Sequence, residues 1–107
     1  MSYEFKTTFW MDFTIADKFG IEAVKDTFKR AFSEWKTNYI FLYELTLVMN
    51  LNCWYHYKKN NIEISKLYAK YYHQLRDYGL NNLKGKELEY FVNNLYDYLK
   101  KIGFIHN

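Results

Sequence analysis

The chain has 107 residues, half of them apolar and a quarter charged, with a formal net charge of +3. This length suits one domain and is too short for two well-packed cores, and the composition excludes the low hydrophobicity and high charge of a disordered chain. A single cysteine excludes both an intrachain disulfide and a thiolate cluster for zinc. We therefore expect one folded domain over residues 1–107.

Apolar side chains on alternate positions near the start of the chain predict a short strand or an extended arm. These positions are Tyr3, Phe5, Thr7, Phe9, Met11 and Phe13. Asp12 is suited to cap a short helix through "FTIADKF", and Gly20 is suited to end it. The amino terminus lacks the basic and apolar segments of a secretory signal, so we expect a cytoplasmic protein.

The segment from Ile21 to Trp35 is predicted to be an amphipathic helix. Its apolar residues recur every three or four positions, as one face of a helix requires. Charged residues fill the other sides, and Asp26 and Arg30 are four positions apart, the spacing of a helical ion pair.

Residues 40–57, "IFLYELTLVMNLNCWYHY", form the most apolar run of the chain. A membrane span needs roughly 18 or more consecutive apolar residues. Glu44 and Asn50 interrupt this run, and we therefore expect no membrane contact. A helix that is apolar nearly all round is instead typical of a central helix buried in protein.

Two further helices are predicted in the second half of the chain. Asn60 and Glu63 have capping-box spacing before a helical pattern that runs to Gly79. The segment "LNNLKG" at 80–85 is predicted to be a loop, and a last helix from Leu88 is expected to close at Gly103. The fold class is therefore all-α, a compact bundle of about four helices, with the short strand or arm at its start.

The residues with chemical potential do not form a recognisable catalytic or metal-binding motif. No two of the three histidines have the spacing of paired metal ligands, and Cys53 with His56 is read as a thiol and an imidazole of the core. Glu44 and His56 are twelve positions apart, which is about 18 Å along a helix, so they cannot act on one small substrate. Glu44 is expected to pair with a cation, and Asn50 to bond a backbone group. We expect no enzyme activity, no metal and no cofactor.

Aromatic residues make up 22% of the chain, with twelve Tyr, nine Phe and three Trp. This is more than a core of this size easily buries, and Tyr and Trp are enriched in protein interfaces. The excess predicts a surface that contacts a protein partner, or a second copy in a dimer. The candidate contact residues are Trp10, Tyr39, Tyr43, Trp54, Tyr55, Tyr57 and Tyr72.

An alternative function follows from the local charge. Residues 55–86 hold seven basic and two acidic residues, although the whole chain is only mildly basic. A stripe of cations with tyrosines nearby would suit a nucleic-acid-binding module that uses the helix over residues 58–76. The candidate basic face comprises Lys58, Lys59, Lys66, Lys70, His73 and Arg76.

Several blocks of the sequence resemble a family of small proteins, without an assigned activity, from phages, prophages and conjugative elements of Firmicutes. The blocks are "DFTIADKFG", "AVKDTFKRAFSEWK", "YELTLVMN", "WYHY" and "NLKGKELEYF", and the resemblance spans roughly residues 9–91. It implies an accessory protein that acts in a bacterial cell by binding and occlusion, such as an inhibitor of CRISPR effectors or other host defences. Residues 92–107 depart from the shorter members of the family, and the resemblance implies no role for them.

Overall fold

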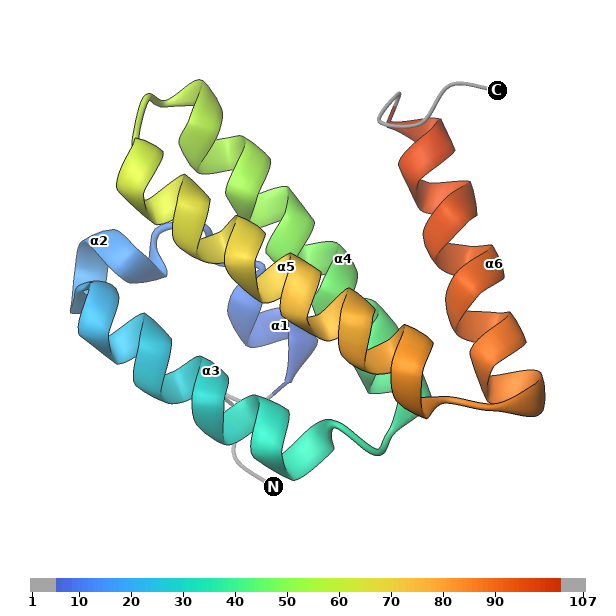
Figure 1. The fold of residues 1–107 in the computed structure, drawn as a ribbon. Helices are drawn as coiled ribbons and strands as arrows, with labels where there is room; N and C mark the ends of the chain where they lie inside the picture. Colours follow the sequence, from blue (N-terminus) through green and yellow to red (C-terminus); the bar gives the residue numbers. More distant parts are fainter. Residues whose placement is uncertain (1–5, 103–107) are drawn as a thin grey trace.

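The computed structural model describes residues 6–102, and these residues form helices without a strand. The elements are α1 (Thr7–Trp10), α2 (Ile15–Phe19), α3 (Ile21–Trp35), α4 (Tyr39–Lys58), α5 (Ile62–Asn82) and α6 (Gly85–Lys101). Figure 1 shows α4 and α5 side by side, with α3 on one side of this pair and α6 on the other. The all-α fold class is confirmed: the four long helices form the predicted bundle, and two short helices precede them.

Helix α4 is the central element of the bundle, as its nearly continuous apolar surface predicts. Its side chains are buried against α1, α5 and α6, and Leu42, Leu45 and Met49 are almost completely enclosed. The Asn38 side chain caps the start of the helix by accepting a hydrogen bond from the Phe41 backbone N–H at 3.1 Å. The run that looked most like a membrane span is therefore the core of the protein.

The predicted N-terminal strand is wrong for the part of it that the structure describes, and Tyr3 and Phe5 lie outside the described residues. Thr7 to Trp10 form α1, with Trp10 fully buried. Asn52 donates to the Trp10 carbonyl at 2.9 Å and to the Val48 carbonyl at 2.8 Å. The alternating pattern favours a strand, but burial of the Trp10 indole against α4 favours the helix that is observed. A strand would also need a partner strand, and residues 6–102 contain none.

The expected cap of α2 is also wrong. The helix begins at Ile15, and its N-cap position is Thr14 rather than Asp12. The Asp12 carboxylate instead accepts hydrogen bonds from the Thr14 hydroxyl at 2.6 Å and backbone N–H at 3.0 Å, and it pairs with Lys18 at 2.9 Å. These contacts, the Thr14 hydroxyl first, lower the pKa of Asp12 to about 2. Gly20 ends α2 as predicted, with a φ of +88°.

Helix α3 has the predicted bounds and packs on α5 through stacked rings. The rings of Phe28 and Tyr71 are 3.8 Å apart between centroids and nearly parallel. The predicted pair of Asp26 and Arg30 is present at 3.7 Å on the solvent side. The helical periodicity therefore identified the face of α3 that contacts the bundle.

Helix α5 differs from its prediction at both ends. Asn60 and Glu63 form no capping box: Asn60 has a φ of +63°, and the N-cap is Asn61, whose side chain makes no capping bond. Gly79 does not end the helix, which continues to Asn82. The Phe91 ring of α6 packs directly on Gly79, where an added Cβ would lie 2.5 Å from the Phe91 Cζ. The glycine is thus a packing site inside a helix, and the predicted end of α6 at Gly103 lies outside the described residues.

Candidate binding groove

Cys53 and His56 do not form a thiol and base pair. The fully buried His56 ring places Nε2 2.9 Å from the Phe13 carbonyl and Nδ1 3.2 Å from Asn61 Nδ2. Burial lowers the pKa of His56, so the neutral ring donates through Nε2 and accepts at Nδ1. Cys53 instead faces Ser65, whose hydroxyl donates to the Cys53 carbonyl at 2.9 Å. His56 therefore connects α4 to Phe13 and Asn61, whereas Cys53 connects α4 to Ser65 of α5.

The other polar residues of α4 and the remaining histidines also assemble no catalytic centre. Glu44 is exposed, and the expected pairing with a cation is wrong, since Glu44 forms no ion pair with any of residues 6–102. His73 is exposed on α5, and His106 lies outside the described residues. Among residues 6–102, no group of three or more His, Cys, Asp or Glu side chains is arranged to hold a metal ion.

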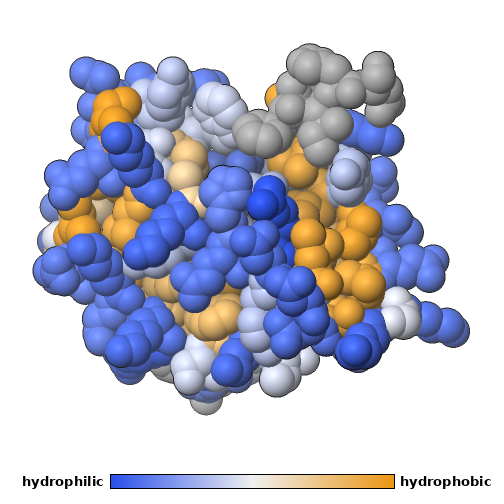
Figure 2. Space-filling view, in the orientation of Figure 1, coloured by the Kyte–Doolittle hydropathy of each residue, from blue (hydrophilic) through white to orange (hydrophobic). Residues whose placement is uncertain are grey.

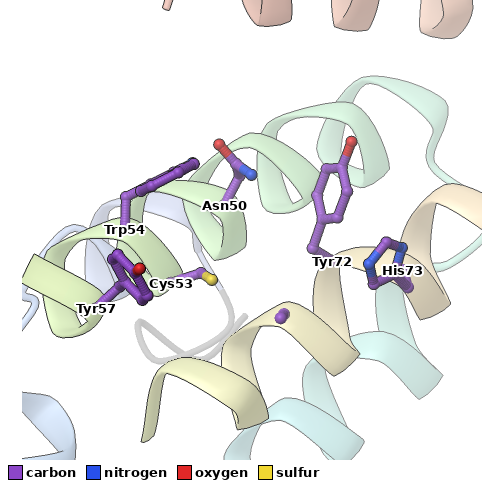
Figure 3. Close-up of a pocket in the computed structure, with 7 residues that line it drawn as sticks. Asn50, Cys53, Trp54, Tyr57, Tyr72 and His73 are labelled. Carbon is purple, nitrogen blue, oxygen red and sulfur yellow. The ribbon is translucent and has the colours of Figure 1, made fainter. Parts of the chain in front are cut away.

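Helices α4 and α5 border an open cavity of about 360 Å³, and its walls include the rings of Trp54, Tyr57 and Tyr72. Figure 3 shows the Asn50 carboxamide between the rings of Trp54 and Tyr72 on the wall of this cavity. The complete lining comprises Asn50, Cys53, Trp54, Tyr57, Ala69, Tyr72 and His73. The volume lies within the range of typical ligand and anchor pockets.

Two further hollows extend this cavity towards α6. One of about 250 Å³ shares Tyr72, and one of about 290 Å³ shares Trp54. Their other lining residues are Leu51, Lys58, Arg76, Leu80, Val92, Leu95, Tyr96, Leu99 and Ile102. These three neighbouring hollows, which share the side chains of Tyr72 and Trp54, are hereafter named the groove.

Helix α6 packs one face on the bundle, with Leu95 and Leu99 buried, and leaves another face open. Phe91 is fully buried against Gly79, whereas Tyr96 and Ile102 are 51% and 43% exposed. Figure 2 shows hydrophobic residues gathered over α6 at the right of the view. An apolar surface that neighbouring helices leave partly open is typical of an interaction site.

Two of the predicted contact aromatics, Trp54 and Tyr57, lie at the mouth of the groove. They are 38% and 58% exposed, and their rings meet edge to face with centroids 5.8 Å apart. Tyr96 and Phe19 are also well exposed, although the sequence analysis did not select them. Nothing in the sequence pattern distinguishes these two rings from the buried aromatics beside them.

The other predicted contact aromatics are partly or fully covered. Tyr39 and Tyr43 are half-buried and meet Tyr90 edge to face, and the half-buried Tyr55 packs on Phe13. Trp10 is fully enclosed and Tyr72 is 4% exposed, so neither ring stands exposed on the surface. Trp10 is held under α4 by the close approach of α1, and Tyr72 contributes one wall of the groove.

The predicted basic residues are on the surface, but they do not form one stripe. Lys58, His73 and Arg76 border the groove, with Arg76 5.8 Å from the Tyr72 ring and paired with Asp77 at 3.2 Å. Lys70 faces the opposite side of α5, where it lines a separate hollow with Lys25 and Lys29. Lys66 is exposed on α5, and the Lys59 amine lies 5.1 Å from the Tyr55 ring.

Asn50 is the most unusual polar residue of the groove. It is only 4% exposed, and its Oδ1 has no hydrogen-bond partner among the described residues. The expected bond to a backbone group is therefore wrong. By contrast, Asn52, Asn82 and Asn94 each donate to the carbonyl four residues earlier. A buried amide without a partner has an uncompensated desolvation cost. Among residues 6–102, other buried atoms, such as Asn52 Oδ1, share this lack of a partner, but Asn50 Oδ1 is the one that belongs to a residue lining the groove.

No family model matches this chain, and comparisons with curated proteins and with solved structures also find no match. The resemblance to phage-encoded proteins therefore stays a prediction. The fold and the groove define the protein as a small helical bundle with a partly open apolar surface. No helix within residues 6–102 is long and apolar enough to cross a membrane.

Proposed function

We propose that this protein is a non-enzymatic protein-interaction module that binds its partner in the groove. The observation that carries the proposal is the groove itself, where exposed Trp54 and Tyr57 stand over an aromatic cavity between α4 and α5. Trp and Tyr are the side chains that most often dominate the binding energy of an interface, and they do so from pockets of this kind.

The proposed setting is the cytoplasm of a bacterial cell, with the protein encoded by a phage or another mobile element. In that setting the protein would inhibit a host defence, in the manner of an anti-CRISPR protein, by occupying a surface that the defence needs. The resemblance of the sequence blocks supports this setting. A mechanism of binding and occlusion needs only a complementary surface, and the groove supplies one.

Affinity capture from the bacterial host tests the proposal. The bait is the wild-type chain, and a variant with Trp54→Ala and Tyr57→Ala removes the two exposed rings at the groove. Phe19→Ala is the matched control, since Phe19 is 63% exposed on α2, which contributes no residue to the groove. We expect the wild type and the control to retain the same protein, and the double variant to lose it. Equal recovery with all three baits would reject the groove as the contact.

The alternative function is nucleic-acid binding by the α5 region. It is favoured by the hollow of about 280 Å³ between α3 and α5, where Lys25, Lys29 and Lys70 surround the Phe28 and Tyr71 rings. The logarithm of the binding constant for such a complex should fall linearly with the logarithm of the salt concentration. A gel shift with single-stranded DNA or RNA at low salt tests it, with Lys29→Glu and Lys70→Glu as the disabling pair. Absence of any complex with the wild type would exclude this function.

A further inference from the structure

The charges that line the groove are all basic. Lys58 lies at the end of α4, and His73 and Arg76 lie on α5. No carboxylate lines any of the three hollows. Asp77 neutralises part of the Arg76 charge, which leaves Lys58 and the remaining Arg76 charge to set the local potential. Opposite charges across an interface speed encounter and select the partner. The groove therefore suits a partner that carries acidic residues beside its apolar contact.

The walls of the groove favour a helix as the bound element. They consist of helical side chains: Leu51 and Trp54 from α4, Tyr72 from α5, and Leu95 and Leu99 from α6. A helix satisfies its own backbone hydrogen bonds, so its apolar face can enter a dry groove without stranding polar groups. A partner that binds by adding a β-strand would need an open sheet edge, and residues 6–102 form no strand.

Asn50 specifies one property of the side chain that anchors such a helix. Its carboxamide is enclosed within the cavity wall, and Oδ1 lacks a donor. With no hydrogen bond to hold it, the carboxamide can turn about χ2, a broad torsion that costs little to change. An anchor with an N–H or O–H group, such as tryptophan, tyrosine or glutamine, would supply the missing donor.

A second copy of the chain fits the groove less well. A two-fold dimer through this surface would place groove against groove and would bring Lys58, His73 and Arg76 towards their own counterparts. Like charges that face each other across an interface disfavour it. The basic residues at the border of the groove thus favour an acidic partner over a second copy of the chain.

On these grounds, and resting on the proposed function, we infer that the groove binds an amphipathic helix of a partner protein, which carries acidic residues beside its apolar face and an anchor side chain that donates a hydrogen bond to Asn50. The helix completes the packing of α6 against α4 and α5.

The test is selection from a displayed library of amphipathic helical peptides about four turns long. Anchor and flanking positions are randomised, and the full chain is the bait. We expect the selected peptides to be rich in Asp and Glu at the flanks and in Trp, Tyr or Gln at one anchor position. A bait with Asn50→Leu should shift the anchor to Leu, Met or Phe, and a bait with Lys58→Glu, His73→Glu and Arg76→Glu should shift the flanks to Lys and Arg. For a selected peptide, Asn50→Leu should weaken binding about fivefold, the factor for one net hydrogen bond.

Three results would overturn the inference: selection of basic or charge-neutral flanks by the wild type, an anchor preference that Asn50→Leu leaves unchanged, or recovery of no helical peptide. Light scattering of the free protein at the bait concentration adds a fourth. A dimer of the wild type that Trp54→Ala and Tyr57→Ala dissociate would identify a second copy as the occupant. Success of affinity capture together with failure of this selection would retain the proposed function and reject only the acidic helix.

Discussion

Substitution of Gly79 by Ala tests the contact that attaches α6 to the bundle. Gly79 lies inside α5, where alanine is favoured over glycine by about 1 kcal/mol of helix propensity. The added Cβ, however, would lie 2.5 Å, 2.6 Å and 3.0 Å from three carbons of the Phe91 ring. That ring is fully buried and has little room to move, and overpacking of this kind costs about 1–3 kcal/mol. Because three ring atoms are affected, we take the upper half of that range and expect a net loss of about 1–2 kcal/mol.

Urea unfolding followed by circular dichroism measures this difference, and thermal unfolding should show a fall in Tm of about 4–8 °C. Gln74→Ala, at an exposed position of the same helix, should change the free energy of unfolding by less than about 0.5 kcal/mol. Phe91→Leu removes the ring atoms nearest to the new Cβ, so the double variant should be more stable than the sum of the single effects predicts. If Gly79→Ala instead stabilises the protein by about 1 kcal/mol, the close contact of Phe91 with Gly79 does not exist.

Three further predictions concern the core and the mouth of the groove. Since burial lowers the pKa of His56, the unfolded chain takes up a proton at a higher pH than the folded chain, and stability should fall as the pH drops below about 6.5. Urea unfolding across that range should show a smaller loss in His56→Gln, and an unchanged loss would assign it to other groups. Asn52→Ala should cost about 1–3 kcal/mol, because it strands the buried Trp10 carbonyl, whereas Ala at the exposed Asn93 should be nearly neutral; equal effects would contradict the Asn52 contact. Trp54→Phe should remove most of the fluorescence that acrylamide quenches, since Trp10 is fully buried and Trp35 is half-buried; unchanged quenching would show that Trp54 is covered.

The long helices were predictable because their stabilising pattern is local. The spacing of apolar residues from Ile21 to Trp35 gave the bounds of α3, and the apolar surface of residues 40–57 identified the central helix. The failures depend on contacts that are distant in sequence. Gly79 had the signature of a helix end, and only Phe91, twelve residues later, explains why a helix interior needs a glycine there. Thr7 to Trp10 alternate like a strand, but the buried Trp10 carbonyl is bonded by Asn52, forty-two residues away.

The groove was only partly predictable for a related reason. Aromatic abundance correctly predicts that some rings stay near water, and Trp54 and Tyr57 do so. It does not say which rings, because exposure depends on which face of each helix the neighbouring helices cover. Tyr72 and Trp54 are both aromatic residues of long helices, yet one is 4% exposed and the other 38%. The lack of any hydrogen bond at Asn50 likewise has no local signal, since Asn52, two residues later, donates two hydrogen bonds from Nδ2, although its Oδ1 is also unpartnered.

Hydroxyl-radical footprinting of the free protein and of its complex with the captured host protein tests the central claim most directly. The groove predicts that Trp54, Tyr57 and Tyr96 are oxidised in the free protein and protected in the complex. Phe19, which is exposed on α2, should be oxidised equally in both states. Protection of Phe19 while Trp54 and Tyr57 continue to be oxidised would contradict the assignment of the groove as the binding surface.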